Sequence, residues 1–408
     1  MAVHRDLRIR ARAAHGAALV VAAASVAACT SERLSTSERL TLASQPSSGG
    51  ERTVVTDESG RRQPTTRLDV RPLARLPWSG RALPLVSPDG RKAVIETAGN
   101  LPWSVRVGDP LPPDGFETTL SAISLNPTEP GSPLATLSGA WVLGRAATDS
   151  GFLVERPHAD GARDVVFVGW NGSQRTVVSD GACNAHATAG SDGRFAWCRR
   201  DPEGGDWALV VERNGVRKAM PTHPGTSWLA PTFSGDGKGL FAMQLQGSAM
   251  AVAWIPCEPD GLPADGATLS RSLLRSPVTV GGSLSWAVRA MDPVPGLAAS
   301  SPGSERLTFW NPETRRTAVW LPGSEPEWLQ SGSLAALVVD AGNALVTLED
   351  SLVRERLGAR RDSELIDRTR WALQPTTLSA SEMVGIAALG DQASIARLTL
   401  SFGEASPR

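Results

Sequence analysis

Cys183 and His186 stand three positions apart, and Cys198 follows further along the chain, which is the first pattern in this sequence that could do chemistry. Thiolate and imidazole are ligands that zinc prefers, and a structural zinc site uses four ligands at short, regular spacing. No fourth ligand stands at such a spacing from these three residues. The sequence therefore predicts no metal site.

The remaining titratable residues do not form an acid/base set either. His158, His186 and His223 are isolated, and a lone histidine is most often a surface or hydrogen-bonded residue. Carboxylates sit mainly in turns such as Asp160-Gly161, although a ring-shaped fold can bring distant carboxylates together. The sequence also contains no GxSxG elbow of the kind that carries a hydrolase serine. We expect no catalytic residue and no cofactor, and an enzyme is the less favoured interpretation.

The chain has four cysteines, and their use depends on the compartment. If Cys29 is modified as argued below, Cys183, Cys198 and Cys257 remain, which allows at most one disulfide in an exported protein. Cys183 and Cys198 are the nearest pair and flank the same turn, so they are the first candidates for a bridge. A bridge that involves Cys257, or no bridge at all, are the alternatives.

Residues 1–28 are typical of a targeting segment, because arginines precede an apolar run from Ala17 to Ala28 that is too short to span a bilayer. The stretch Val26-Ala27-Ala28-Cys29 resembles the bacterial lipobox. That resemblance implies that Cys29 is lipidated, becomes the new N-terminus, and holds the protein at the cell envelope on the periplasmic side of a membrane or at the outer membrane. Secretion with cleavage nearby and an uncleaved anchor are the alternatives.

Residues 29–67 are rich in Ser, Thr, Arg, Gly and Gln and have few apolar residues, so we expect a disordered, flexible tether. An edge strand over residues 53–56 is a weaker alternative. Removal of four arginines and Asp6 with the targeting segment moves the formal net charge from -1 to -4. A mildly acidic chain lacks the basic surface that binds phosphates, so we expect no nucleic-acid partner.

From residue 68 the sequence repeats a short turn followed by an apolar run. The turn glycines are Gly90, Gly151, Gly193, Gly237, Gly282 and Gly332, which gives steps of 61, 42, 44, 45 and 50 residues. The long first step contains two Pro-rich stretches between Asp109 and Gly139, which we interpret as loop insertions and as the place to look for function. A seventh unit near Ser379 lacks the glycine.

A second hairpin follows each turn and brings the unit to four strands. Asn171-Gly172 and Asn214-Gly215 are the clearest cases, because both residue types tolerate the positive φ of a type I′ turn. Four-stranded sheets that repeat in this way bury their faces against one another in a ring. We therefore predict an all-β fold, a single β-propeller of six or seven blades over residues 68–403, followed by a short tail at 404–408. The stretch Leu68-Asp69-Val70 could supply the strand that closes the ring, and residues 362–373 could form a short helix or an irregular linker.

The run Ser87-Pro88-Asp89-Gly90-Arg91 resembles the turn of the WD40-like repeats in propellers of the TolB type, and Ser191-Asp192-Gly193-Arg194 and Gly235-Asp236-Gly237-Lys238 are similar. The resemblance covers residues 70–400 as an architecture. It implies that Asp89, Asp192 and Asp236 cap their own turns and that Gly90, Gly193 and Gly237 supply the positive φ, which is a structural and not a chemical role.

The chain has thirteen tryptophans and no tyrosine. We expect the tryptophans inside apolar runs to fill space between blades: Trp197, Trp254, Trp286, Trp310 and Trp320. Those beside Pro, Ser or Gly are candidates for binding loops, where an exposed indole ring stacks on sugars or anchors a partner: Trp78, Trp103, Trp228 and Trp328.

These observations together predict a non-catalytic, membrane-tethered propeller that binds an envelope protein or a cell-wall component. The alternative is an enzyme or a carbohydrate-binding protein with its site in the central channel, acting on an envelope polymer. A purely structural spacer is a third class. The sequence does not identify the ligand or the partner.

Overall fold

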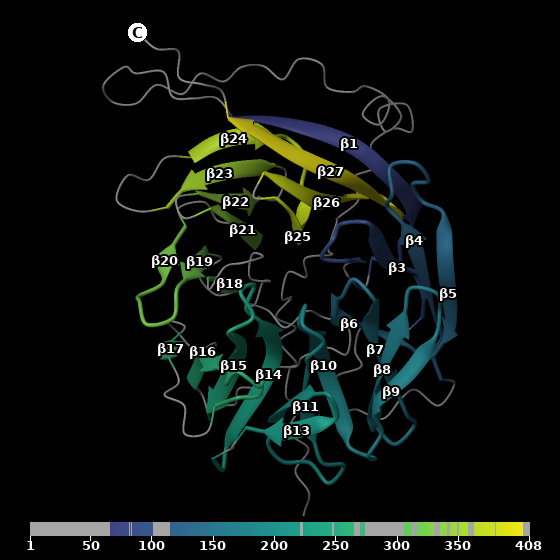
Figure 1. Ribbon diagram of the computed structural model, residues 1–408, viewed down its shortest axis with the longest axis vertical. Helices are drawn as coiled ribbons and strands as arrows, with labels where there is room; N and C mark the ends of the chain where they lie inside the picture. The colour runs from purple at the N-terminus through teal and green to yellow at the C-terminus, as the bar shows by residue number, and fades with distance from the viewer. Residues whose placement is uncertain are drawn as a thin grey trace, which may run out of the picture.

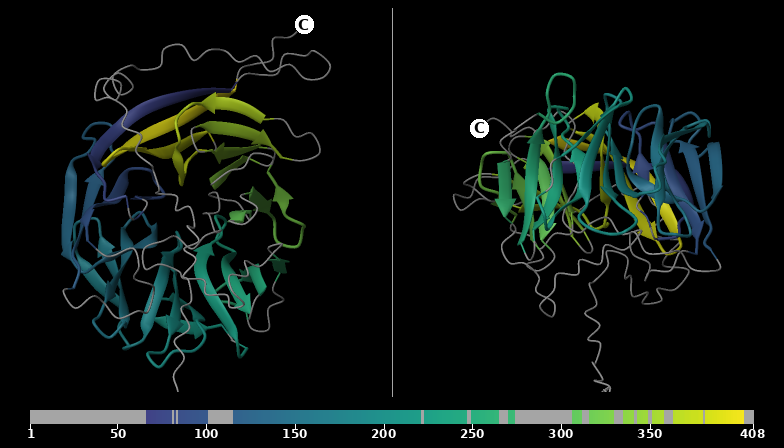
Figure 2. Two further views of the ribbon diagram at one scale, coloured as in Figure 1. Left: turned by 180° about the vertical axis from the view of Figure 1, so that it is seen from behind. Right: turned by 90° about the horizontal axis from the view of Figure 1, so that it is seen from below.

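The computed structural model describes residues 66–402 except 81, 83, 101–114, 221–222, 247–248, 265–269, 274–305, 312–315, 330–334, 341–342, 349–350, 358–362 and 380. Every described element is a β-strand. The strands form groups that stand around a common axis, and the side view shows most of them running from one face of the ring to the other (Figures 1 and 2). This arrangement confirms the predicted all-β propeller.

The described strands form six hydrogen-bonded sheets, one of which divides at a single parallel pair, and we number the resulting antiparallel groups as blades 1 to 7 in chain order. Blade 1 holds β2 (Leu85–Val86), β3 (Lys92–Gly99), β4 (Thr118–Ser124) and β5 (Pro133–Gly139). Blade 2 holds β6 (Val142–Ala147), β7 (Gly151–Pro157), β8 (Arg163–Gly169) and β9 (Gln174–Val178). Blade 3 holds β10 (Cys183–Ala189), β11 (Phe195–Arg200), β12 (Ala208–Arg213) and β13 (Val216–Ala219). One parallel pair, Arg163 with Cys183, joins blades 2 and 3.

The later blades repeat the pattern. Blade 4 holds β14 (Thr226–Phe233), β15 (Gly239–Gln246), β16 (Ala249–Pro256) and β17 (Ser270–Leu273). The described part of blade 5 holds β18 (Leu307–Asn311), β19 (Arg316–Trp320) and β20 (Glu327–Trp328). Blade 6 holds β21 (Ala335–Asp340), β22 (Asn343–Thr347), β23 (Leu352–Arg356) and β24 (Ser363–Asp367), and blade 7 holds β25 (Ala372–Ser379), β26 (Glu382–Leu389), β27 (Gln392–Phe402) and β1 (Thr66–Pro77).

The ring closes by pairing β1 with β27, as the sequence predicted for Leu68-Asp69-Val70. The pairing is antiparallel from Thr66 opposite Phe402 to Pro77 opposite Gln392, with a bulge at Leu73. Thr66 is also fixed to blade 6, because its N–H and its hydroxyl donate to the two carboxylate oxygens of Glu364 at 2.8 Å and 2.9 Å. Arg354 forms an ion pair with the same carboxylate at 2.9 Å. Thr66, the first described residue, is therefore held by both blade 6 and blade 7, and we call its contact with Glu364 the Glu364 clamp.

The hydrophobic core lies between the blades. Seven clusters of buried side chains each join two consecutive blades, including blade 7 with blade 1. Trp197 lies between blades 2 and 3, and Trp320 lies with Trp254 between blades 4 and 5, which confirms their predicted packing role. Trp286 and the side chain of Trp310 lie outside the described residues. Burying both faces of each small sheet requires two neighbours.

Each of the Asp-Gly turns connects the first two strands of its own blade. Asp89, Asp192 and Asp236 each accept a hydrogen bond from the N–H two positions further along the chain. Gly90, Gly193 and Gly237 have φ angles of 66°, 83° and 75°, where a side chain would be strained. These residues therefore mark the same position in three blades.

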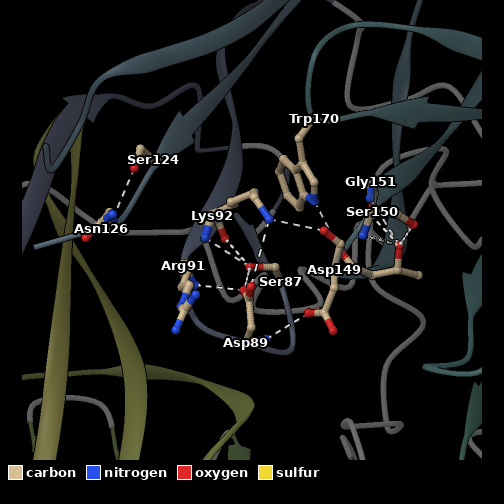
Figure 3. A network of polar contacts seen from close by, with 11 residues as sticks. Ser87, Asp89, Arg91, Lys92, Ser124, Asn126, Asp149, Ser150, Gly151 and Trp170 are labelled. Carbon is tan, nitrogen blue, oxygen red and sulfur yellow. Dashed lines mark hydrogen bonds and ion pairs between the residues drawn. The ribbon is translucent and has the colours of Figure 1, made fainter.

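At blade 1, the Asp89 turn also contacts the turn of blade 2. The N–H of Asp89 donates to the Asp149 carboxylate at 3.0 Å (Figure 3). The Lys92 ammonium donates to the Asp149 carbonyl at 3.1 Å and lies 5.9 Å from the ring centre of Trp170 (Figure 3). The turn that the sequence assigned a structural role thus also serves as a contact between blades.

At blade 3 the contact is made by Arg194, which is 1% exposed. Its guanidinium binds Asp192 in its own turn and donates to the carbonyls of Gly237 and Gly261 in blade 4. It also lies 4.8 Å from the ring centre of Phe233. Arg194 therefore fixes the spacing of blades 3 and 4 at one face of the ring.

One expectation about local structure is wrong. Residues 363–367 form strand β24 paired with β23, where the sequence suggested a helix or a linker over 362–373. Of the two Pro-rich stretches between Asp109 and Gly139, the second forms the connection between β4 and β5, which are paired strands of blade 1. Residues 101–114, which include most of the first stretch, and the predicted targeting segment and tether up to residue 65, lie outside the described residues.

We expect Arg194→Gln to lower the free energy of unfolding by about 2–4 kcal/mol, because two carbonyls in blade 4 and the Asp192 carboxylate lose a charged donor. Urea unfolding measures this change. Arg91→Gln is the matched control, because Arg91 stands at the same turn position in blade 1 but is exposed. Equal effects of the two substitutions would contradict the assigned role of Arg194.

We expect Glu364→Ala to lower the free energy of unfolding by about 3–5 kcal/mol, since it leaves Arg354 buried without this carboxylate and frees the first residue of β1. Limited proteolysis should then cut within β1 beyond Thr66, where the wild type is protected by pairing with β27. Glu129→Ala, at an exposed turn in blade 1, should change neither measurement. A Glu364→Ala protein as resistant to protease as the wild type would refute the clamp.

Candidate functional site on the innermost strands of blades 2 and 3

The candidate site is built around β6 and β10, the innermost strands of blades 2 and 3, and β14 is the corresponding strand of blade 4 (Figure 1). The pairing register of each strand shifts once: between Leu143 and Ala147 in β6, between Ala185 and Thr188 in β10, and between Leu229 and Thr232 in β14. Such bulges turn individual side chains out of the regular alternation. His186 in the β10 bulge and Ala230 in the β14 bulge have positive φ angles of 58° and 50°.

A buried ion pair supports the bulge of β10. Arg163 in β8 donates to Glu155 in β7 at 2.7 Å, and both side chains are almost fully buried. The other oxygen of Glu155 accepts the backbone N–H of Ala187 at 3.2 Å. Two residues of blade 2 therefore hold the backbone of blade 3 beside His186.

Asn184 adds a second connection between these blades. Its side-chain amide donates to the Arg163 carbonyl at 3.0 Å and to the Asp180 carboxylate at 2.8 Å. Arg199 binds the other oxygen of Asp180 at 2.9 Å, and these partners hold the pKa of Asp180 below its usual value against the opposing effect of burial. The carbonyl oxygen of the Asn184 side chain is buried and has no partner among the described residues.

His186 is the buried imidazole of the site and is 6% exposed. Burial lowers the pKa of His186 to about 3, and the nearby charges of Arg145 and Arg163 contribute in the same direction. The imidazole is therefore neutral at neutral pH. Its Nε2 atom has no partner among the described residues, and the indole ring of Trp207 lies edge-on at 6.3 Å between ring centres.

Arg145, in the β6 bulge, carries a charge that no described carboxylate pairs with at salt-bridge distance. Its Nε atom is shielded from solvent without a partner, and burial lowers the pKa of Arg145, while the field of Glu155 and Cys198 opposes the shift. In blade 3, Arg200 lies 4.7 Å from the ring centre of Trp207, and its Nε atom is likewise shielded without a described partner. Charged and neutral hydrogen-bond donors thus gather around His186.

The disulfide expected between Cys183 and Cys198 does not form, and both thiols are free, as is Cys257. Cys183 lies opposite Arg200 and Cys198 lies opposite Ala185, so the two cysteines are diagonal neighbours on paired strands. Diagonal neighbours are about 7–8 Å apart, beyond the reach of a disulfide. Burial raises the pKa of Cys183 to about 11 and also raises the pKa of Cys198, so neither thiol is a ready nucleophile.

The four tryptophans proposed as binding residues have different surroundings. Trp228 is 1% exposed in strand β14 and packs between blades 3 and 4, so its assignment to a loop is wrong. Trp78 follows β1, is partly buried and donates to the Ala82 carbonyl at 2.8 Å. Trp328 lies in β20 against the cluster between blades 4 and 5. Trp103 lies outside the described residues.

Among the described residues, no group of three or more His, Cys, Asp and Glu side chains could hold a metal ion. Nor does the described part of the chain include a helix able to cross a membrane. Sequence reasoning missed Arg145, Glu155, Arg163 and Trp207, which belong to no motif and come from strands β6, β7 and β8 and from the loop before β12. For the first three, the signal was a charged residue within an otherwise apolar strand.

No protein-family model and no curated protein sequence matches the chain. Among solved structures it is similar to the Dos1 propeller, with 10% identity and a TM-score of 0.45 over 80% of this chain and 95% of that one. It is similar to a TolB-type protein from Agrobacterium tumefaciens, with 12% identity and a TM-score of 0.35 over 83% and 99%. The propeller domain of the trilobed protease from Pyrococcus furiosus gives 9% identity and a TM-score of 0.45 over 80% and 95%. No functional residue is transferred at this level of similarity.

The neutral state of His186 predicts how stability depends on pH. Folding lowers the pKa of His186 from 6.5 to about 3, so the folded chain favours the neutral imidazole. The stability that this preference contributes is fully present above pH 6.5 and is lost as the pH falls toward 3. Relative to His186→Gln, the wild type should lose about 1.4 kcal/mol of unfolding free energy per pH unit below pH 6. Urea titrations at several pH values measure this difference, and His223→Gln, at an exposed position, should keep the wild-type slope.

Proposed function

We propose that this chain is a lipid-anchored binding scaffold of the bacterial cell envelope, on the periplasmic side of a membrane or at the outer membrane. A closed propeller suits a binding or scaffold role in general, because its rigid blades present loops and an axial surface without needing catalytic residues. The finer claim, an envelope protein or a cell-wall component as partner, rests on the lipobox-like stretch that ends at Cys29.

The observation that carries the proposal is the position of β1. This strand is the outermost of blade 7, and its first residue is fixed to Glu364 at the rim of the ring (Figure 1). A chain that comes from a membrane anchor therefore enters the fold at the outer edge of blade 7. The anchor would then not cover the innermost strands of the ring. As a flexible coil, the 37 residues from 29 to 65 would span roughly 30–35 Å.

The alternative of an enzyme with a site at the ring axis gains no support from the cluster around His186. Glu155, the carboxylate of that cluster, is already neutralised by Arg163. A general acid needs a raised pKa and a partner carboxylate across the substrate, as in glycoside hydrolysis. The sugar-binding alternative also loses Trp228, which is buried between blades.

Lipidation is tested by labelling intact cells with a traceable fatty acid and recovering the protein. The wild type should carry the label, and Cys29→Ala should lose it completely, because the acyl groups are attached through this thiol. Cys257→Ala is the matched control and should keep the label. Label that persists in Cys29→Ala would reject the anchor.

The partner is sought by crosslinking in the same cells. A specific envelope protein or cell-wall fragment should be recovered with the wild type and should decrease at least several-fold with Cys29→Ala. A protein that recovers nothing specific would behave as a spacer, and turnover of an envelope polymer by the purified protein would overturn the scaffold assignment.

A further inference from the structure

Strand β5, the outermost strand of blade 1, is an open edge of the ring. Among the described strands it pairs with β4 alone. The blades stand around an axis, so their outermost strands face away from it and a second molecule can approach β5 from outside (Figure 1). A strand at the edge of a sheet presents a row of N–H and C=O groups that another strand can pair with.

This edge differs from the other edges of the ring because it carries no charge. Its seven residues, Pro133–Gly139, are Pro, Leu, Ala, Thr, Leu, Ser and Gly. Natural proteins block pairing at sheet edges with charged side chains, with proline or with very short strands. The proline of β5 stands at its first position, where a proline is compatible with pairing. Each of the other described outermost strands contains a charged residue: Arg175 in β9, Arg217 in β13, Arg271 in β17, Glu327 in β20, Glu364 in β24 and Arg67 in β1.

β5 is also held in place from one side only. Leu137 is buried and Ala135 is half-buried against the cluster that joins blades 1 and 2. On the opposite face, Leu134, Thr136 and Ser138 are exposed, and Leu134 is 39% exposed although it is apolar. The edge is therefore ordered before anything pairs with it, and an added strand would cover part of its exposed face.

We propose that β5 pairs antiparallel with β5 of a second copy of this chain across a two-fold axis. Opposite side chains of an antiparallel pair lie on the same face, so a two-fold axis places one residue opposite its own copy. Full overlap of the seven residues makes that residue Thr136, with Leu134 opposite Ser138.

Two observations favour a second copy as the occupant. Two copies of an uncharged strand bring no like charges together, whereas the same pairing through β9 or β13 would bring arginines close to their own copies. Both edges are also ordered in advance, so their pairing avoids the entropy cost that a disordered peptide pays when it binds. The inference goes beyond the proposed function and rests on the fold, not on the lipid anchor.

The first test places one cysteine on β5 of the full chain and looks for a disulfide between two copies in intact cells after mild oxidation. Opposite positions of an antiparallel pair have Cα atoms about 4.5–5.5 Å apart, within reach of a disulfide. Thr136→Cys should therefore give a dimer on a non-reducing gel, and the wild-type chain gives the background of its own four cysteines.

Ser138→Cys is the matched control, because Ser138 is exposed on the same face of the same strand. In the proposed pairing the two copies of position 138 lie four residues apart along the strands, about 13 Å, which is too far for a disulfide. We expect at least fivefold more crosslinked dimer with Thr136→Cys than with Ser138→Cys.

The second test measures the mass of the purified chain by sedimentation equilibrium. We expect a reversible dimer with a dissociation constant in the micromolar range, because one strand pair buries less surface than a standard interface. Thr136→Lys places two ammonium groups opposite each other and should weaken the dimer at least tenfold. Thr176→Lys, at an exposed position of the outermost strand of blade 2, should leave it unchanged. Thermal unfolding checks that both variants fold.

A chain that stays monomeric at every concentration, equal crosslinking through positions 136 and 138, or a dimer that persists in Thr136→Lys would each overturn the pairing. A monomer that holds an extended segment of another protein at β5 would also overturn it and would assign the edge to that protein. None of these results changes the fatty-acid labelling of Cys29, so this proposal and the lipid anchor fail separately.

Discussion

The pairing of β1 with β27 is the contact on which the rest of this fold depends. A four-stranded sheet has two apolar faces, and each face here is covered by the next blade through one of seven clusters of buried side chains. An open arc would leave a face of its first and last blades in water. The pairing, with the Glu364 clamp at its end, makes blade 7 from both ends of the described chain and lets blades 7 and 1 cover each other.

Contacts between turns complement the apolar interfaces. Arg194 and the Asp89 turn each reach from one blade to the next at the same face of the ring, where the hydrophobic side chains end. Apolar packing is tolerant of small shifts, whereas a guanidinium held by two carbonyls and a carboxylate is not. The Asp-Gly turns thus contribute to the spacing of the blades, and their carboxylates accept hydrogen bonds within the turns.

The sequence was sufficient for the architecture because local turn chemistry and repeat length are recorded in adjacent residues. Asn171-Gly172 and Asn214-Gly215 connect hairpins as predicted, and Asn214 and Gly215 both have positive φ. Failures occurred where pairing with a distant strand overrode a local pattern. Residues 362–373 have apolar residues at helical intervals, but residues 363–367 pair with β23 as a strand. Trp228 stands near Ser and Pro because the bulge of β14 accommodates Pro231. The cluster around His186 could not be foreseen, since its members are joined only by the packing of β10 against blade 2.

The closing pair also determines the order in which the chain can complete its fold. β1 is the first described strand to be synthesised, and its partner β27 is the last, so the ring stays open until nearly all of the chain is present. Contacts of such sequence separation form slowly, and unpaired strand edges invite association with other chains. A newly made molecule therefore has two unmatched edges for the whole of its synthesis. The fold is therefore completed only when the last described strand meets the first.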